Sequence, residues 1–199
     1  MKTLASNYVG KKSNYKGSKL SNETLQVAVD KSLEQIEMFD SMMKESAGES
    51  LVSMMEMANI SSMFGNFLAM NISQGEGYIK NAPHTFPDLL AKDAKRVQDI
   101  EIKVSLEKNL PKGHLPKAGQ YLIVRYSLVD ESGVLRQDRG EHMGIYEVRF
   151  GQLEIEDFNL SSTANDSGKT ATIKTPSLKK MGLLYFNPLL DPSNFKGKK

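Results

Sequence analysis

Glu101 and Lys103 lie two positions apart in a segment that alternates between apolar and polar residues. The alternation runs from Asp99 to Leu106 and is typical of a β-strand with one buried face and one polar face. Because side chains two positions apart on a strand point the same way, Glu101 and Lys103 are expected to share the polar face. A carboxylate and an ammonium group held side by side are suited to binding a metal ion and a phosphate.

A second carboxylate, that of Asp88, is expected to face Glu101 across a hairpin. The polar residues 93–96 suit a four-residue connection between the apolar run at 89–90 and the strand. A turn centred there pairs residue 92 with residue 97 and Asp88 with Glu101. Directly paired residues hold their Cβ atoms about 5 Å apart, so the two carboxyl groups would be close enough to share one divalent cation.

The predicted pair suits Mg²⁺, a hard cation that takes oxygen ligands from one or two carboxylates, water and substrate phosphate. The backbone carbonyl of Ile102 is the natural third protein ligand. Lys103 would orient or activate the attacking water and offset the charge that develops in the transition state. In a competing interpretation, Asp88 starts a turn, and Asp99, Glu101 and Lys103 form a solvated strand face without chemistry.

The sequence Phe86-Pro87-Asp88, followed by Glu101-Ile102-Lys103, resembles the PD-(D/E)xK nuclease superfamily, and the chain's size and layout look most like a type II restriction endonuclease. The resemblance implies an α/β fold with a central mixed β-sheet flanked by helices. It also implies Mg²⁺-dependent, sequence-specific cleavage of double-stranded DNA by a homodimer whose symmetry matches a palindrome. By position, it makes Asp88 and Glu101 metal ligands and Lys103 the catalytic lysine.

Many relatives in this superfamily carry a further glutamate on the helix before the sheet. The corresponding stretch here, residues 65–70, contains no acidic residue. Glu56, earlier in the same expected helix, could substitute, although an exposed helical glutamate without any role would look the same.

Two other functions fit the same residues. A nuclease of the same fold that acts in DNA repair, recombination or phage DNA processing would cut without dependence on base sequence. A catalytically inert DNA-binding module would keep its full function after Asp88 or Lys103 is replaced.

The elements that position these residues are expected to be helical first and sheet-forming afterwards. From the candidate N-caps Ser21 and Asn22, apolar residues recur at helical spacing as far as the break at 47–48. A second helix is expected over about 49–70, interrupted near Asn59 or Gly65. The sheet-rich catalytic core is expected at 78–190, with later strands at 121–129, 144–150, 153–158, 170–175 and 183–186, a hairpin connection at 150–152 and at most a short helix at 176–180.

Basic residues outside the site are candidates for DNA contact. The loop at 107–119 follows the polar strand directly and contains Lys112, His114 and Lys117, although an ordinary basic surface loop would look similar. The first twenty residues carry five lysines and no acidic residue, which fits either a flexible arm or a grip on backbone phosphates. On chemical grounds alone, guanine could be read by Arg136, Arg139 and Arg149.

Composition limits the remaining choices. A chain of 199 residues with 39% hydrophobic content suits a single domain. The absence of cysteine excludes thiolate metal sites and cysteine nucleophiles. The net charge of +2 is low for a nucleic-acid-binding protein, so the clustering of basic residues matters more than their number. No segment approaches the roughly 20 apolar residues needed to cross a bilayer, and a cytoplasmic location is expected.

Overall fold

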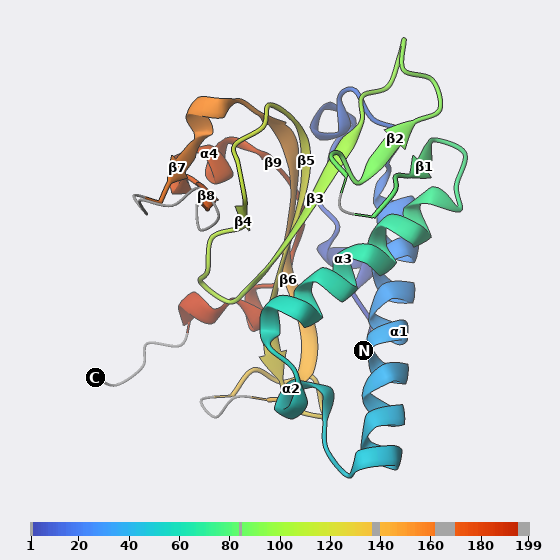
Figure 1. The fold of residues 1–199 in the computed structure, drawn as a ribbon, viewed down its shortest axis with the longest axis vertical. Coiled ribbons are helices and arrows are strands. Elements are labelled where there is room, and N and C mark those ends of the chain that lie inside the picture. The colour runs from blue at the N-terminus through green and yellow to red at the C-terminus, as the bar shows by residue number, and fades with distance from the viewer. Residues whose placement is uncertain (1, 84, 137–139, 162–169, 195–199) are drawn as a thin grey trace.

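The protein has an α/β fold built on a six-stranded mixed β-sheet. The computed structural model describes residues 2–83, 85–136, 140–161 and 170–194. Two long helices, α1 and α3, lie against one face of the sheet, whereas small strands and a short helix lie on the other (Figure 1). The expected combination of a mixed sheet with helices is confirmed at this level.

Helix α1 spans Asn22–Ala47 and begins and ends as the sequence predicts. The Ser21 side chain accepts a hydrogen bond from the backbone N–H of Thr24, and Gly48 ends the helix in the left-handed conformation, at φ 74°. Both ends are therefore set by local capping residues.

The second predicted helix is divided into α2, Leu51–Met54, and α3, Met57–Ser73. The break falls at residues 55–56, where the backbone is extended, and not near Asn59 or Gly65 as the sequence suggested. Gly65 stays helical and faces the sheet, since a Cβ built on it would lie 3.5 Å from Val104 Cγ2. This glycine therefore contributes to helix–sheet packing and does not interrupt the helix.

The main sheet has the strand order β1-β2-β3-β5-β6-β9. Only the β3–β5 pair is parallel, and the other neighbouring pairs are antiparallel. Residues 107–118 form the crossover that a parallel pair requires. The strands are β1 (Tyr78–Lys80), β2 (Leu89–Ala91), β3 (Ile100–Leu106), β5 (Gly119–Val129), β6 (His142–Leu153) and β9 (Gly182–Phe186).

A three-stranded sheet of order β4-β8-β7 covers part of the second face of the main sheet (Figure 1). Its strands are β4 (Lys112–Gly113), β7 (Phe158–Leu160) and β8 (Ala171–Ile173), and helix α4, Thr175–Lys180, follows β8. Five short 3₁₀ segments complete the described chain, at Ala5–Asn7, Lys12–Tyr15, Ile155–Asp157, Pro188–Leu190 and Pro192–Asn194.

Two of the predicted strands after the site are wrong in their limits. Residues 150–152 do not form a hairpin connection, because they continue β6, where Gly151 pairs with Tyr121 of β5. The predicted strand at 153–158 is instead the end of β6 followed by a 3₁₀ turn. The strands at 121–129, 170–175 and 183–186 and the short helix at 176–180 are confirmed within a few residues.

The N-terminal segment is packed on the domain. The backbone N–H and the hydroxyl of Thr3 donate hydrogen bonds to Asp30 Oδ1 at 2.8 and 2.6 Å. Tyr8 forms a β-bridge with Tyr185 of β9, and Tyr15 is buried in the main core. Residues 2–20 therefore do not form the flexible arm that the sequence suggested, although the lysines of this segment are exposed.

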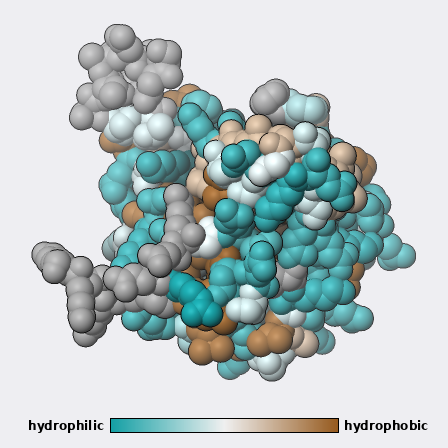
Figure 2. All heavy atoms as spheres, turned by 90° about the horizontal axis from the view of Figure 1, so that it is seen from below, coloured by the Kyte–Doolittle hydropathy of each residue, from teal (hydrophilic) through white to brown (hydrophobic). Residues whose placement is uncertain are grey.

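Among the described residues, no helix is long and apolar enough to span a membrane. Seen from the lower end of Figure 1, the molecule is mainly hydrophilic, and its hydrophobic residues are scattered in small groups (Figure 2). Isolated exposed apolar residues of this kind are normal for protein surfaces.

Candidate active site

The predicted hairpin forms with the expected register but with a longer connection. Leu89 of β2 pairs with Ile100 of β3, and the next pair in the same register would be Asp88 with Glu101. The connection spans residues 92–99 and is not a four-residue turn. The Asp99 side chain explains the difference, because its Oδ1 accepts a hydrogen bond from the Ala91 N–H at 2.7 Å and replaces a backbone partner there.

Asp88 lies just beyond the ladder between β2 and β3 and caps it with its side chain. Its Oδ2 accepts a hydrogen bond from the backbone N–H of Ile102 at 2.7 Å. Because the N–H and C=O of one strand residue point to the same side of the strand, the Ile102 carbonyl also faces the edge that Asp88 occupies. The three groups predicted to hold a metal therefore meet at the end of β2.

Glu101 is almost completely buried, with 7% of its surface exposed. Its Oε1 accepts a hydrogen bond from the Lys103 Nζ. Its Oε2 is also buried but has no hydrogen-bond partner within the described structure. A buried, unpaired carboxylate oxygen is unfavourable unless a proton or a cation satisfies it.

The electrostatics of Glu101 lead to the same conclusion. Burial raises the pKa of the Glu101 carboxyl, and the negative charge of the adjacent Asp88 raises it further, while the ammonium group of Lys103 opposes both effects. The carboxyl group of Asp88 is close enough for its charge to act on Glu101. Two adjacent carboxylates of this kind are stabilised by a shared cation.

Lys103 connects this buried pair to the surface. Its side chain is 27% exposed, compared with 9% for that of Glu101. The backbone of Gly113 in β4 approaches it closely, because a Cβ built on Gly113 would lie 3.5 Å from Lys103 Cε. The second sheet thus holds the lysine against Glu101 while leaving part of the side chain accessible.

These residues fit a Mg²⁺ ion with an open coordination sphere. The unpaired Glu101 Oε2, the Asp88 carboxylate and the Ile102 carbonyl are all hard oxygen donors. Within the described ranges, there is no group of three or more histidine, cysteine or acidic residues that could hold a metal ion. With three protein ligands, an ion held here would retain positions for water and phosphate.

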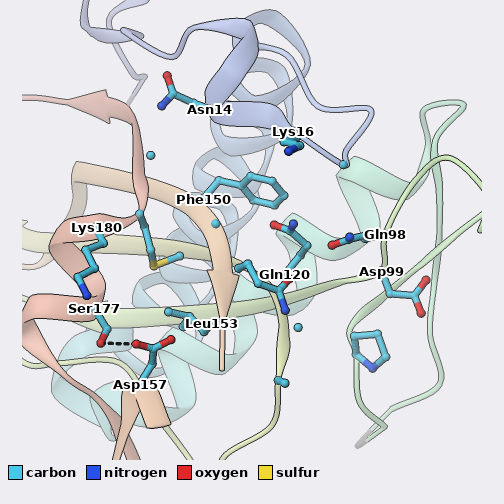
Figure 3. A pocket seen from close by; sticks show the side chains of 18 of the residues that line it. Asn14, Lys16, Gln98, Asp99, Gln120, Phe150, Leu153, Asp157, Ser177 and Lys180 are labelled. Atoms are coloured by element: carbon cyan, nitrogen blue, oxygen red, sulfur yellow. Dashed lines mark hydrogen bonds between the residues drawn. The ribbon is translucent and has the colours of Figure 1, made fainter. Parts of the chain in front are cut away.

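A large cleft of about 1070 Å³ opens near the end of the main sheet (Figure 3), but Asp88, Glu101 and Lys103 are not among the residues that line it. Phe86 and Pro87, which immediately precede Asp88, form part of its wall. Its other lining residues come from the N-terminal segment, the 92–99 connection, the ends of β5 and β6, and α4. The polar lining includes Gln98 and Gln120, neither of which has a sequence signal that predicts a role.

The predicted DNA-contacting residues of the crossover loop are all exposed, but they differ in position. Lys117 lies over the ring of Phe86, with its Nζ 4.5 Å from the ring centroid, and is therefore close to the cleft wall. Lys112 belongs to β4, where it pairs with Thr172 of β8. His114 lies in the bend that follows β4.

The suggested helper glutamate, Glu56, is in the wrong place. It is an exposed residue at the start of α3. Ser61, one turn later, hydrogen-bonds the Tyr126 hydroxyl at 2.9 Å, and Tyr126 pairs with Leu106 at the far end of β3. Five residues of strand, or roughly 17 Å, separate Leu106 from Glu101. Glu56 therefore cannot join the metal site.

Two of the three arginines suggested for guanine contacts already have protein partners. Arg136 is paired with Asp130. Arg149 pairs with Glu147 at 3.0 Å and donates to the Met181 carbonyl at 3.1 Å, with its side chain 16% exposed. Arg139 lies outside the described residues. Arg149 therefore has a mostly buried position in the sheet, held by Glu147 and the Met181 carbonyl.

Comparisons with known proteins leave the family open. No protein-family model matches the chain, and no curated protein sequence matches it significantly. The functional argument consequently depends on the geometry of the site.

Proposed function

We propose that this protein is a Mg²⁺-dependent endonuclease of the PD-(D/E)xK type that cleaves double-stranded DNA at a specific sequence. One observation carries the proposal: the carboxyl groups of Asp88 and Glu101 adjoin each other, with Lys103 bonded to Glu101 and a buried Glu101 oxygen unpaired. The mixed sheet with helices is compatible with this class. A homodimer belongs to the proposal because two symmetry-related cuts match a twofold assembly.

In this proposal the roles of the residues follow from their positions. Asp88, Glu101 and the Ile102 carbonyl hold the ion. Bound Mg²⁺ would lower the pKa of a water and withdraw charge from the scissile phosphate. Lys103, which is partly exposed, places an ammonium group where negative charge grows on the phosphate. The Asp88–Ile102 hydrogen bond fixes one carboxylate before substrate arrives.

Plasmid digestion tests the proposal. The purified chain is incubated with supercoiled plasmid in Mg²⁺, in Ca²⁺ and in EDTA, and the product ends are sequenced. We expect cleavage in Mg²⁺ alone, at discrete positions. Ends scattered over the plasmid would support a nuclease of the same fold without sequence specificity. Intact plasmid, together with retained DNA binding, would support the inert binding module.

A further inference from the structure

The cleft whose wall includes Phe86 and Pro87 is lined by four residues with side-chain amides, Asn14, Gln98, Gln120 and Gln152. Gln98 and Gln120 approach each other from the 92–99 connection and from β5 (Figure 3). They converge on Gly17, since a Cβ built there would lie 3.5 Å from Gln120 Nε2 and 3.5 Å from Gln98 Cδ. Two amides that meet at one wall can offer paired donors and acceptors to one ligand.

Gln120 provides a second sign of a missing ligand. Its Oε1 is buried and has no hydrogen-bond partner within the described structure. Buried side-chain polar atoms are usually paired, so the unpaired amide oxygen behind this cleft wall would gain a partner if the side chain turned toward a ligand that carries a donor. The exocyclic amino group of a nucleobase is such a donor.

The charged side chains of the cleft suit a polyanion. Lys16, Arg96 and Lys180 line it and are exposed. Of the two lining acids, Asp157 accepts hydrogen bonds from the Ser177 hydroxyl at 2.6 Å and the Glu154 N–H at 2.8 Å (Figure 3). The other, Asp99, accepts the hydrogen bond from Ala91 described above. The acids thus complete local turns, whereas the three cations are exposed, with Arg96 lying 3.9 Å from Asp93.

The cleft is connected to the site through Phe86 and Pro87, which line it and immediately precede Asp88. Gln120 pairs with Ile100, and the next pair along the same two strands is Tyr121 with Glu101, so Gln120 is one residue from the site in the sheet while its side chain points to the opposite face. The volume of about 1070 Å³ exceeds the range of about 300–1,000 Å³ usual for small ligands, so it has room for more than one nucleotide.

We propose that this cleft binds the DNA next to the scissile phosphate and reads it through Gln98 and Gln120. An adenine is the expected base, because a glutamine amide bonds its N6 and N7 in a bidentate manner. Lys16, Arg96 and Lys180 bind backbone phosphates. DNA as the ligand rests on the proposed function.

Binding in the absence of cleavage tests the base-reading part. The full chain is incubated in Ca²⁺ with a duplex library of random sequence, and bound molecules are selected and sequenced. We expect an adenine preference that Gln120→Leu and Gln98→Leu each weaken, by roughly five- to 150-fold in affinity for the selected site. Gln98 is exposed, so its replacement tests the proposal even if Gln120→Leu impairs folding. The control, Gln74→Leu at the end of α3, should keep the wild-type preference.

Salt dependence tests the phosphate contacts. Lys16→Gln and Lys180→Gln should each weaken binding to all sequences and reduce the slope of log K against log salt by about 0.9. Lys31→Gln, an exposed lysine on α1 outside the cleft, should change neither quantity.

The outcomes separate this proposal from the nuclease proposal. Cleft-dependent binding without cleavage in Mg²⁺ would retain the DNA site and remove the enzyme. Cleavage whose sequence preference is unchanged in both glutamine variants would retain the enzyme and overturn the reading site. Failure to bind DNA at low salt would overturn the cleft proposal directly.

Discussion

The two faces of the main sheet are built in different ways. The face under α1 and α3 is packed with fully buried apolar side chains such as Leu25, Phe64 and Leu122. The opposite face carries a band of polar residues across β3, β5 and β6, including Glu101, Ser105, Arg125, Glu147 and Arg149. In the described chain, the buried side-chain atoms that lack a partner belong to four of these band residues and to Gln120.

The difference shows that the apolar face provides most of the stability, whereas the polar face carries the candidate functional residues. Apolar burial against the helices supplies the main driving force for folding. The polar band is held by ion pairs. The Glu147 carboxylate pairs with Arg125 Nη1 and with Arg149 Nη2, each at 3.0 Å. Buried pairs of this type contribute little net stability compared with apolar packing. An unpaired buried polar atom in such a band reduces stability unless a ligand or a proton satisfies it.

The largest expected effect is the loss of stability when the apolar core under α1 and α3 is disrupted. Phe64 is fully buried in α3, and Phe64→Ala should reduce the free energy of unfolding by about 3–5 kcal/mol, measured by urea denaturation. Cleavage per folded molecule should not change. The exposed Val27 provides the control, because Val27→Ala should alter stability by less than about 0.5 kcal/mol. Equal effects of the two variants would contradict the assignment of this face as the main core.

On the polar face, we expect a substitution to affect the cleavage rate more than stability. Lys103→Met should lower the cleavage rate by roughly 10²- to 10³-fold, because it removes a cation from the growing charge on the phosphate. The matched control is Lys95→Met in the exposed connection, which should cleave normally. Single-turnover rates with saturating Mg²⁺ measure the effect. A Lys103→Met protein that cleaves at the wild-type rate would remove the lysine from the mechanism.

The parts of this arrangement that the sequence predicts are those fixed by local patterns. The limits of α1 follow from Ser21 and Gly48, and the pairing of Leu89 with Ile100 follows from strand alternation on either side of a polar connection. The division of β6 was predicted wrongly because Gly151 resembles a turn residue. Its extended conformation is imposed by pairing with Tyr121, which lies thirty residues earlier.

The cleft could not be predicted for a related reason. Its walls come from the N-terminal segment, the 92–99 connection, two strand ends and α4, which meet only after folding. Gln98 and Gln120 have no local signature, and the lysines of the first twenty residues indicated only a general basic character. Glu56 was a plausible helper in the sequence, but the break before α3 and the packing of Ser61 on Tyr126 place it at the other end of β3.

Metal binding should stabilise the polar face by a measurable amount. If Mg²⁺ binds the folded site alone, a concentration of one hundred times its Kd adds about 2.7 kcal/mol to the free energy of unfolding. Asp88→Asn should abolish most of this gain, whereas Asp93→Asn in the exposed connection should retain it. Thermal melts with and without Mg²⁺ give the comparison without depending on activity. An equal Mg²⁺ response in both variants would place the ion elsewhere.

The pH dependence of stability tests the electrostatics of Glu101 without metal. Burial, followed by the charge of Asp88, raises its pKa in the folded state. The stabilising contribution of this carboxyl is therefore fully present below its unfolded pKa and is lost as the pH rises through the folded value. Each pKa unit of the shift corresponds to about 1.4 kcal/mol.

Glu101→Gln does not titrate, so in EDTA its stability relative to the wild type should increase between acid and neutral pH. Urea denaturation over that range measures the difference. A constant difference at all pH values would mean that the pKa of Glu101 is the same in the folded and unfolded states.

The smallest expected effect concerns Gln120, whose proposed role in DNA binding conflicts with the stability of the folded protein. Its unpaired buried oxygen disfavours the folded state, and a partnerless buried acceptor costs about 1–3 kcal/mol. Gln120→Met keeps the length of the side chain and removes the acceptor, so it should raise the free energy of unfolding by about 1 kcal/mol. The same change should weaken DNA binding. A variant that gains stability while it loses binding would show that this amide is retained for a ligand, whereas a loss of both would show that Gln120 is bonded within the free protein.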